Sequence, residues 1–143
     1  MPMIDVYAPE DLFPPGIEGE LAAELTRAIL RAEGVDTPTA AHLDNTAAYI
    51  HRLDASAVNT ARNGRARTVR VDILTPPGAL NREAQKRLVA EVTGIVAKLS
   101  GDPGQAARTW VLLSEAAEGG WGIAGTAFGR EEFGAALRGK KQP

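Results

Sequence analysis

The chain has 143 residues, of which 44% are hydrophobic, 24% charged and 5% aromatic, which is the composition of a globular protein rather than a disordered or fibrous one. Lys and Arg total 16 against 18 Asp and Glu, so no basic excess favours nucleic-acid binding. The absence of cysteine excludes disulfides and thiolate catalysis, and two histidines, His42 and His51, speak against a histidine-rich metal site. We therefore expect no metal and no nucleic-acid partner.

Membrane and export signals are also absent from the sequence pattern. No apolar run is long enough to cross a bilayer, and residues 1–5 lack the charged and apolar regions of a signal peptide. We therefore expect a cytoplasmic protein with no membrane contact, folded as a single domain over residues 1–143.

The two halves of the chain resemble each other. Residues 4–9 (IDVYAP) resemble residues 71–76 (VDILTP), and residues 46–50 align with 109–113 after one short gap. Such self-similarity predicts two copies of one structural unit. The copies are placed at 2–53 and 68–127, with a polar connector at 54–67 and a tail at 134–143.

The first unit is predicted to fold as strand, helix, strand. Residues 4–9 are rich in strand-forming side chains and end at a proline, and residues 46–52 form the second strand. Between them, one apolar stripe at helical spacing indicates a helix that ends at Gly34. The stripe consists of Ile17, Leu21, Leu25, Ile29 and Ala32.

The second unit repeats this pattern after its own first strand. Asn81 is the predicted N-cap of the helix, Gly101 follows its end, and residues 109–115 form the last strand. The apolar stripe of this helix consists of Leu88, Val92, Ile95 or Val96, and Leu99.

A helix between two strands implies parallel pairing through a right-handed crossover. The fold class is therefore α/β (α+β), with a four-stranded sheet and two helices on one face. Residues 110–113 form a continuous apolar run, which is typical of a strand buried on both faces. Other subunits would have to cover the second face, so we predict a homo-oligomer; the alternative is that residues 116–133 cover it.

Pro2 offers a candidate catalytic group. A small second residue permits removal of Met1, which would leave a free prolyl amine at the start of the first strand. An α-amino group has a reference pKa of about 7.7–8.0, and burial lowers it, so a neutral amine could take a proton from carbon. The alternative is that Pro2 is only a permitted second residue. Val69, an internal residue, stands at the equivalent place in the second unit, so one site per chain is expected.

Met1-Pro2, the tandem units and residues 114–125 (SEAAEGGWGIAG) together resemble the tautomerase superfamily, and within it 4-oxalocrotonate tautomerase, over residues 2 to about 127. The resemblance implies a fused chain that assembles as a homotrimer. It also implies that Pro2 is a general base that interconverts the enol and keto forms of a small 2-oxo acid without a cofactor. Trp121 matches the aromatic residue that lines the site.

The chain departs from the family pattern in its arginines. The short-form enzymes bind carboxylates with two arginines, and this sequence has Leu12 and Ala47 near those positions in its first unit. In the second unit the positions fall near Ala79 and on Trp110, which becomes a candidate substrate contact. The dicarboxylate substrate of the namesake is therefore not expected.

Other side chains could take over these roles. Arg108, if the last strand extends back to it, and Arg70 are candidates to hold a carboxylate and polarise a carbonyl. The alternative is that these arginines are solvated surface charges with no role in binding. His51 is predicted to lie on the second strand of the first unit, and Asn45 is predicted to open that strand. Either side chain could donate a hydrogen bond to an enolate oxygen. The alternative for His51 is a surface or interface role.

Two further functions stay open. If the prolyl amine is protonated at neutral pH, it would act as an acid in hydratase, decarboxylase or dehalogenase-type chemistry at the same site. The chain could also be a non-catalytic trimeric scaffold or ligand-binding protein, because a fold does not guarantee an activity.

Overall fold

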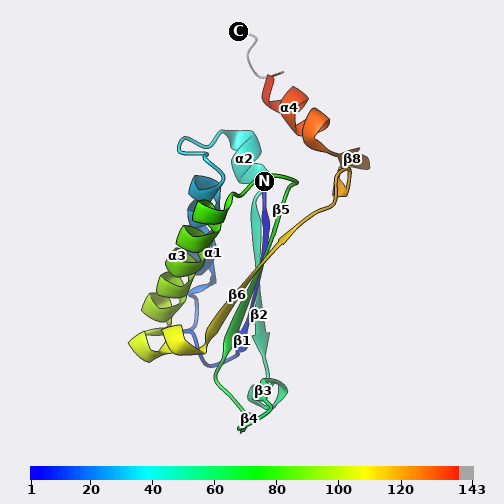
Figure 1. Cartoon of the computed structure of the whole chain (residues 1–143). Coiled ribbons are helices and arrows are strands. Elements are labelled where there is room, and N and C mark those ends of the chain that lie inside the picture. The colour runs from blue at the N-terminus through cyan, green and yellow to red at the C-terminus, as the bar shows by residue number, and fades with distance from the viewer. Residues whose placement is uncertain (139–143) are drawn as a thin grey trace.

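The computed structural model describes residues 1–138, with side chains to residue 135; residues 139–143, the end of the predicted tail, lie outside the described part. Four strands form one mixed sheet in the order β2-β1-β5-β6. They are β1 (Met3–Pro9), β2 (Ala47–Leu53), β5 (Val69–Thr75) and β6 (Thr109–Glu115). The helices α1 (Glu18–Ala32) and α3 (Arg82–Ser100) lie side by side on one face of this sheet (Figure 1).

Strand pairing follows the repeat. β1 pairs with β2 in parallel and β5 pairs with β6 in parallel, as right-handed crossovers through α1 and α3 require. The two units then join through an antiparallel β1–β5 ladder. The predicted tandem β-α-β fold, with two helices on one face, is confirmed.

The helix-facing side of the sheet is the hydrophobic core. Alternate residues of the two central strands are buried there, and the predicted stripes of α1 and α3 pack against them, with Val96 rather than Ile95 the more deeply buried choice. The fully buried members include Ile4, Val6, Val69, Val71, Ile73, Leu21, Leu25, Ile29, Val92 and Val96.

Local signals set the ends of both helices. The Asn81 side chain accepts a hydrogen bond from Ala84 N at 2.9 Å, which satisfies one free amide in the first turn of α3. α3 ends on Gly101 at φ 75°, and Gly34, at φ 82°, follows the cap of α1. Both glycines occupy the left-handed conformation that other residues avoid, so both predicted helix ends are confirmed.

The antiparallel ladder gives the chain an internal twofold relation. Asp5 pairs directly with Asp72, which holds the same place in the second unit. Residues before and after this pair are matched in reverse order, so that Met3 faces Leu74. The starts of β1 and β2 therefore lie at one end of the sheet, and the starts of β5 and β6 lie at the other.

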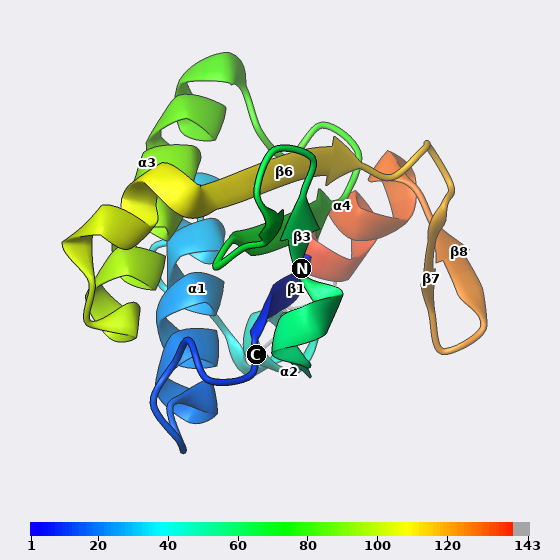
Figure 2. The same ribbon diagram turned by 90° about the horizontal axis from the view of Figure 1, so that it is seen from below.

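Residues 1–138 leave the second face of the sheet open. Tyr49, Trp110 and Leu112 on this face are 55%, 51% and 51% exposed. The alternative that residues 116–133 cover this face is wrong, because the hairpin of β7 (Trp121–Ile123) and β8 (Thr126–Phe128) projects beyond the end of the sheet (Figures 1 and 2).

Short elements fill the connections. A helix that the sequence pattern did not predict, α2 (Ala40–Asp44), precedes β2, so the strand begins at Ala47 and Asn45 caps α2 instead of opening the strand. The region after β2 holds the turn η1 (Ala55–Ala57) and the small hairpin of β3 (Asn59–Thr60) and β4 (Gly64–Arg65). η2 (Pro103–Arg108) precedes β6, and α4 (Arg130–Arg138) follows the β7–β8 hairpin.

Within residues 1–138, every helix is too short or too polar to cross a membrane.

The core packing predicts a difference between two valines of α3. Val92 is fully buried against the sheet, whereas Val89 faces outward and is 36% exposed. We expect Val92→Ala to lower the free energy of unfolding by about 2 kcal/mol, because it removes two buried methyl groups and leaves a cavity. Val89→Ala, the matched control, should change it by less than about 0.5 kcal/mol. Equal losses in urea unfolding would contradict this assignment of the core face.

Candidate active site

Pro2 is buried at the end of the sheet where β1 and β2 start. Its carbonyl oxygen accepts a hydrogen bond from Ala47 N at 3.3 Å, which extends the β1–β2 ladder to Pro2. Since β5 is antiparallel to β1, the ends of β5 and β6 reach the same end of the sheet. The N-terminus therefore meets the segments that follow Thr75 and Glu115.

A pocket of about 320 Å³ opens beside the N-terminus. Four separate parts of the chain build it: the N-terminus, the region from the end of α1 through α2, the loop after β5, and α4. The lining residues are Met1, Glu33, Val35, His42, Pro76, Pro77, Ala79, Arg130, Phe133 and Gly134.

Glu33 is the buried acid of this pocket. One carboxylate oxygen, Oε2, lies 3.0 Å from the amino nitrogen of Met1, and the two side chains are only 7% and 13% exposed. The other oxygen, Oε1, is buried without a hydrogen-bond partner among the described residues. Burial raises the pKa of the Glu33 carboxyl above its ordinary value, and the nearby N-terminal ammonium group partly opposes that rise.

α4 forms one side of the pocket, and the β7–β8 hairpin packs against α4. Trp121 is 5% exposed and packs edge-on against Phe133, with ring centroids 6.5 Å apart, and Phe128 lies 5.5 Å from the same ring. Phe133 in turn lines the pocket. Trp121 therefore supports the pocket wall through Phe133, and its predicted role as a direct substrate contact stays a prediction.

Arg130 brings a guanidinium group to the pocket from the first turn of α4. Its main-chain nitrogen donates to Glu118 Oε1 at 2.7 Å, and its Nε lies 3.7 Å from Glu118 Oε2. Gly78, at φ 74°, lies under this side chain: a Cβ at that position would be 3.4 Å from Arg130 Nε and Nη2. The glycine therefore lets Arg130 lie close to the loop after β5.

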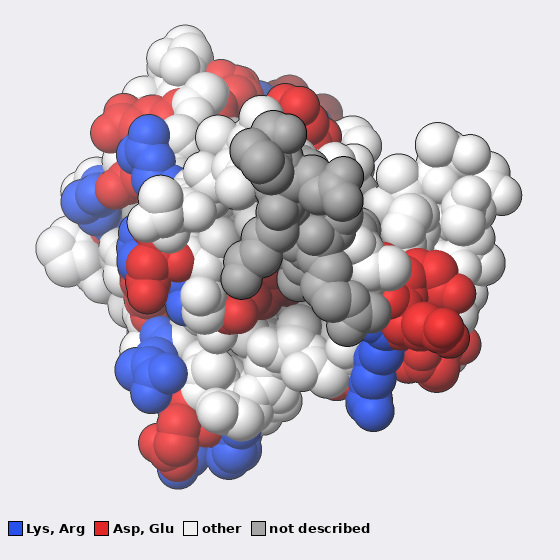
Figure 3. Space-filling model, turned by 90° about the horizontal axis from the view of Figure 1, so that it is seen from above, with Lys and Arg blue, Asp and Glu red and all other residues white. Residues whose placement is uncertain are grey.

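Charge is unevenly distributed at this end of the molecule. Figure 3 shows it from above: acidic side chains form a cluster on the side of the hairpin, whereas acidic and basic side chains are interspersed along the opposite side. Arg130 therefore adds a positive charge to a pocket lining that also holds the N-terminal ammonium group of Met1 and the Glu33 carboxyl group.

Three other predicted site residues meet at the opposite end of the sheet. Arg70 Cζ lies 4.5 Å from the centroid of the Tyr7 ring. The His51 ring stacks on the Tyr7 ring, with 4.4 Å between the two ring centroids. Trp110 pairs with Arg70 across the β5–β6 ladder. Tyr7, Arg70 and Trp110 line a second pocket of about 250 Å³.

His51 and Arg70 also contact carboxylate groups on this open face. His51 Nε2 lies 2.7 Å from Asp5 Oδ1, and Arg70 Nε lies 3.2 Å from Asp72 Oδ1. These contacts tie both side chains to the two aspartates that pair at the middle of the β1–β5 ladder. Arg70 pairs with Tyr7, five residues along β1 from Pro2, which corresponds to about 16 Å.

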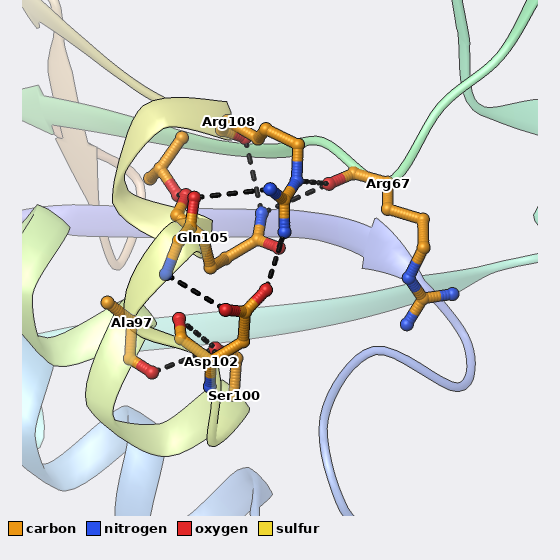
Figure 4. A network of polar contacts seen from close by, with 8 residues as sticks. Arg67, Ala97, Ser100, Asp102, Gln105 and Arg108 are labelled. Atoms are coloured by element: carbon orange, nitrogen blue, oxygen red, sulfur yellow. Dashed lines mark hydrogen bonds and ion pairs between the residues drawn. The ribbon is translucent and has the colours of Figure 1, made fainter.

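Arg108 is the last residue of η2 (Figure 4). It therefore lies outside β6 and does not share a strand face with Trp110. Its guanidinium group donates to Asp102 at 2.7 Å, to Gln105 at 3.0 Å and to the carbonyl oxygen of Arg67 at 3.3 Å. These bonds tie η2 to the start of β5, and the hydrogen bond from Arg108 holds the pKa of Asp102 below its ordinary value.

Within one chain the structure thus separates the predicted site residues. Pro2 directly follows Met1, which lines the first pocket, while Arg70, Trp110, His51 and Arg108 lie toward the other end of the sheet. Asn45 lies near the start of β2, and its amide donates to Ala41 O at 2.9 Å. The assignment of the two arginines to the Pro2 site stays a prediction, and it requires that another chain bring them there.

Sequence reasoning missed Glu33 and Arg130. Glu33 was hidden at the end of an amphipathic helix, and it meets Met1 only through a contact that spans 32 residues of sequence. Arg130 was hidden in a polar segment that had no recognisable partner. Among residues 1–138, no group of three or more His, Asp or Glu side chains could hold a metal ion.

Comparison with known proteins gives a match in structure only. No family model and no curated protein sequence matches the chain. A wild-type fused 4-OT, described as a symmetric trimer, superimposes with a TM-score of 0.72 at 18% identity, over 87% of this chain and 93% of that one. The chain has the fused 4-OT fold.

Two further structures share this fold. Pt0534 inactivated by 2-oxo-3-pentynoate matches with a TM-score of 0.73 at 16% identity, over 91% of this chain and 98% of that one. N1, a member of the cis-3-chloroacrylic acid dehalogenase family, matches with a TM-score of 0.71 at 19% identity, over 99% of this chain and 92% of that one. The predicted likeness to the tautomerase superfamily is confirmed at the level of the fold.

The ring contacts of Phe133 predict which side chain holds α4 against the β7–β8 hairpin. We expect Phe133→Ala to release α4 from the hairpin, because Phe133 carries the ring contacts with Trp121 and Phe128. Hydrogen exchange of the α4 amides should become at least tenfold faster, while exchange in α3 stays unchanged. Glu131→Ala, an exposed change on the same helix, is the control. Equal protection of α4 in both variants would contradict this role of Phe133.

Proposed function

We propose that the protein is a cofactor-independent tautomerase that interconverts the keto and enol forms of a small 2-oxo acid. The observation that carries this proposal is the position of the N-terminus. Met1 lines a pocket of about 320 Å³ and the sheet fixes Pro2 directly after it, so loss of Met1 would open this pocket toward a prolyl amine.

In this proposal Pro2 is the general base. Its neutral nitrogen takes a proton from the carbon next to the substrate carbonyl, and in the reverse direction the prolyl ammonium returns it. Burial favours the neutral amine, because it disfavours the charged form. The apolar walls of Val35, Pro76 and Phe133 keep water away from the reacting atoms.

Arg130 supports a carboxylate-bearing substrate. A guanidinium group binds a carboxylate through paired hydrogen bonds, and this one lies on the rim of the pocket beside the N-terminus. Pt0534, which shares the fold, is inactivated by 2-oxo-3-pentynoate, itself a 2-oxo acid. Arg70 and Arg108 would add to such binding only from a neighbouring chain.

Two measurements on one sample test the proposal. The intact mass should show loss of Met1, and the protein should accelerate the interconversion of enol and keto phenylpyruvate. We expect Pro2→Ala to lower kcat at least 100-fold, in the range typical of a removed acid–base group. A primary alanine amine in place of the prolyl amine accounts for any residual rate. Retained Met1, or equal rates in both proteins, would leave the scaffold hypothesis as the better explanation.

We further propose that the chain assembles as a homotrimer through the open face of the sheet. This face exposes Trp110, Leu112 and Tyr49, and an apolar sheet face of this kind is normally covered. The fused 4-OT structures that share the fold are described as trimers.

A charge on the open face should prevent assembly. We expect Leu112→Lys to convert the trimer to a monomer in light scattering after gel filtration, because a lysine in a covered apolar face would be buried without a partner. Val89→Lys, on the helical side of the molecule, should leave the trimer intact. A monomeric wild-type protein, or a trimeric Leu112→Lys variant, would contradict the proposed interface.

A second candidate function is acid chemistry at the same proline, in hydration, decarboxylation or dehalogenation. The observation that favours it is the Glu33 carboxylate beside the N-terminal amine, since an opposite charge favours the protonated amine. N1, of the cis-3-chloroacrylic acid dehalogenase family, shares the fold. A Pro2 nitrogen that titrates by NMR with a pKa above about 9, beyond the amine reference range, would favour this candidate over the tautomerase.

A further inference from the structure

We propose that Glu33 is a second catalytic residue of the pocket, whose carboxyl group exchanges a proton with the carbonyl oxygen of the substrate while Pro2 exchanges one with the neighbouring carbon. This inference rests on the proposed function, and it assigns that site its second proton-transfer group.

The first argument is the place that Met1 occupies. Glu33 contacts the nitrogen of Met1, one residue before Pro2. Pro2 is held by the hydrogen bond from Ala47 N, and its ring fixes its own backbone angle, so the strand keeps Pro2 in place when Met1 leaves. Glu33 is also fixed, because its main-chain nitrogen donates to Ile29 O at 3.0 Å.

Removal of Met1 therefore leaves a gap between two anchored groups. The gap has the size of one residue, about 3.8 Å along the chain, plus the space of a methionine side chain. The pocket of about 320 Å³ continues from this gap. A small 2-oxo acid that fills it would touch the prolyl nitrogen on one side and the Glu33 carboxyl on the other.

The second argument is the electrostatic setting of Glu33. Besides Glu33 and Met1, the charged or titratable residues that line the pocket are His42 from α2 and Arg130 from α4, and loss of Met1 would add the prolyl amine. Burial already raises the pKa of Glu33, even with the Met1 ammonium group opposing the rise. A carboxyl group of this kind changes its protonation state closer to neutral pH, as an acid–base catalyst must.

The third argument is the unused oxygen. Glu33 Oε2 contacts the Met1 nitrogen, and buried Oε1 has no hydrogen-bond partner among the described residues. A buried acceptor without a partner costs free energy unless a ligand or water satisfies it. A substrate hydroxyl group could donate a hydrogen bond to Oε1. When Glu33 is protonated, its carboxyl group could instead donate a hydrogen bond to the carbonyl oxygen of the substrate.

The proton balance is complete without any further reagent. In the enol-to-keto direction, the Glu33 carboxylate takes the enol hydroxyl proton as the carbonyl forms, and the prolyl ammonium gives its proton to the carbon. The products are the 2-oxo acid, a neutral prolyl amine and a protonated Glu33. One proton then returns from Glu33 to the prolyl nitrogen through solvent, which restores the starting state.

The test uses the mature protein, with loss of Met1 verified by mass, and enol phenylpyruvate as the probe. In the wild type, kcat/KM should fall toward acid pH as Glu33 becomes protonated, with a midpoint above the ordinary carboxyl value of 4.5 because the pKa of Glu33 is raised. Glu33→Gln should lower kcat at least 100-fold and remove this acid limb. Glu83→Gln, an exposed acid on α3, is the matched control and should keep both rate and limb.

The outcomes separate this inference from the proposed function. If Pro2→Ala is inactive while Glu33→Gln keeps the wild-type kcat and acid limb, Glu33 is not catalytic and the tautomerase proposal stands. If Pro2→Ala is as active as the wild type, the proposed function fails, and the inference fails with it.

A second variant covers the case in which Glu33→Gln does not fold. Glu33→Asp keeps a carboxylate but withdraws it by one methylene group, so we expect kcat between those of the wild type and Glu33→Gln, with the acid limb retained. A folded Glu33→Asp protein whose rate shows no acid limb would overturn the proposal.

Discussion

The antiparallel pairing of β1 with β5 is the constraint on which the rest of the molecule depends. Each β-α-β unit alone has two strands and one helix, which is too little to bury an apolar face. The β1–β5 ladder joins the two units into one sheet, and α1 and α3 then cover its core side together. Because this ladder is antiparallel, with Asp5 facing Asp72 at its middle, the two units run in opposite directions. Their equivalent ends, and the two pockets, therefore lie at opposite ends of the sheet.

The candidate site depends on this arrangement and on the elements α2 and α4, which pack at one end of the sheet only. The end with Pro2 receives α2 and α4, whereas the opposite end receives η1 and the β3–β4 hairpin. The two ends thus differ in chemistry although the ladders beneath them match. One has a chain terminus, a buried carboxyl and a guanidinium group, and the other has an aromatic row with Arg70 stacked on Tyr7.

The sequence predicted those features that depend on local signals. Asn81 and Gly101 bound α3 as expected, because capping requires only neighbouring backbone groups. The repeat and the apolar stripes predicted the sheet and its covered face. Asn45 was misplaced because α2 lies where a direct entry into β2 was expected. Glu33 and Arg130 were not found, because their proximity to the N-terminus arises from contacts between segments far apart in sequence, for which no local pattern exists.

Because Asp5 pairs directly with Asp72, the chain has the arrangement of a dimer of two similar subunits that are joined covalently. In a dimer of separate, identical chains, any substitution would appear in both halves at once. Here the connector keeps the halves at a fixed one-to-one ratio while letting each sequence change independently. Val69 can therefore fill a position where Pro2 stands in the other half, and the molecule can specialise one end without giving up the symmetric ladder that holds it together.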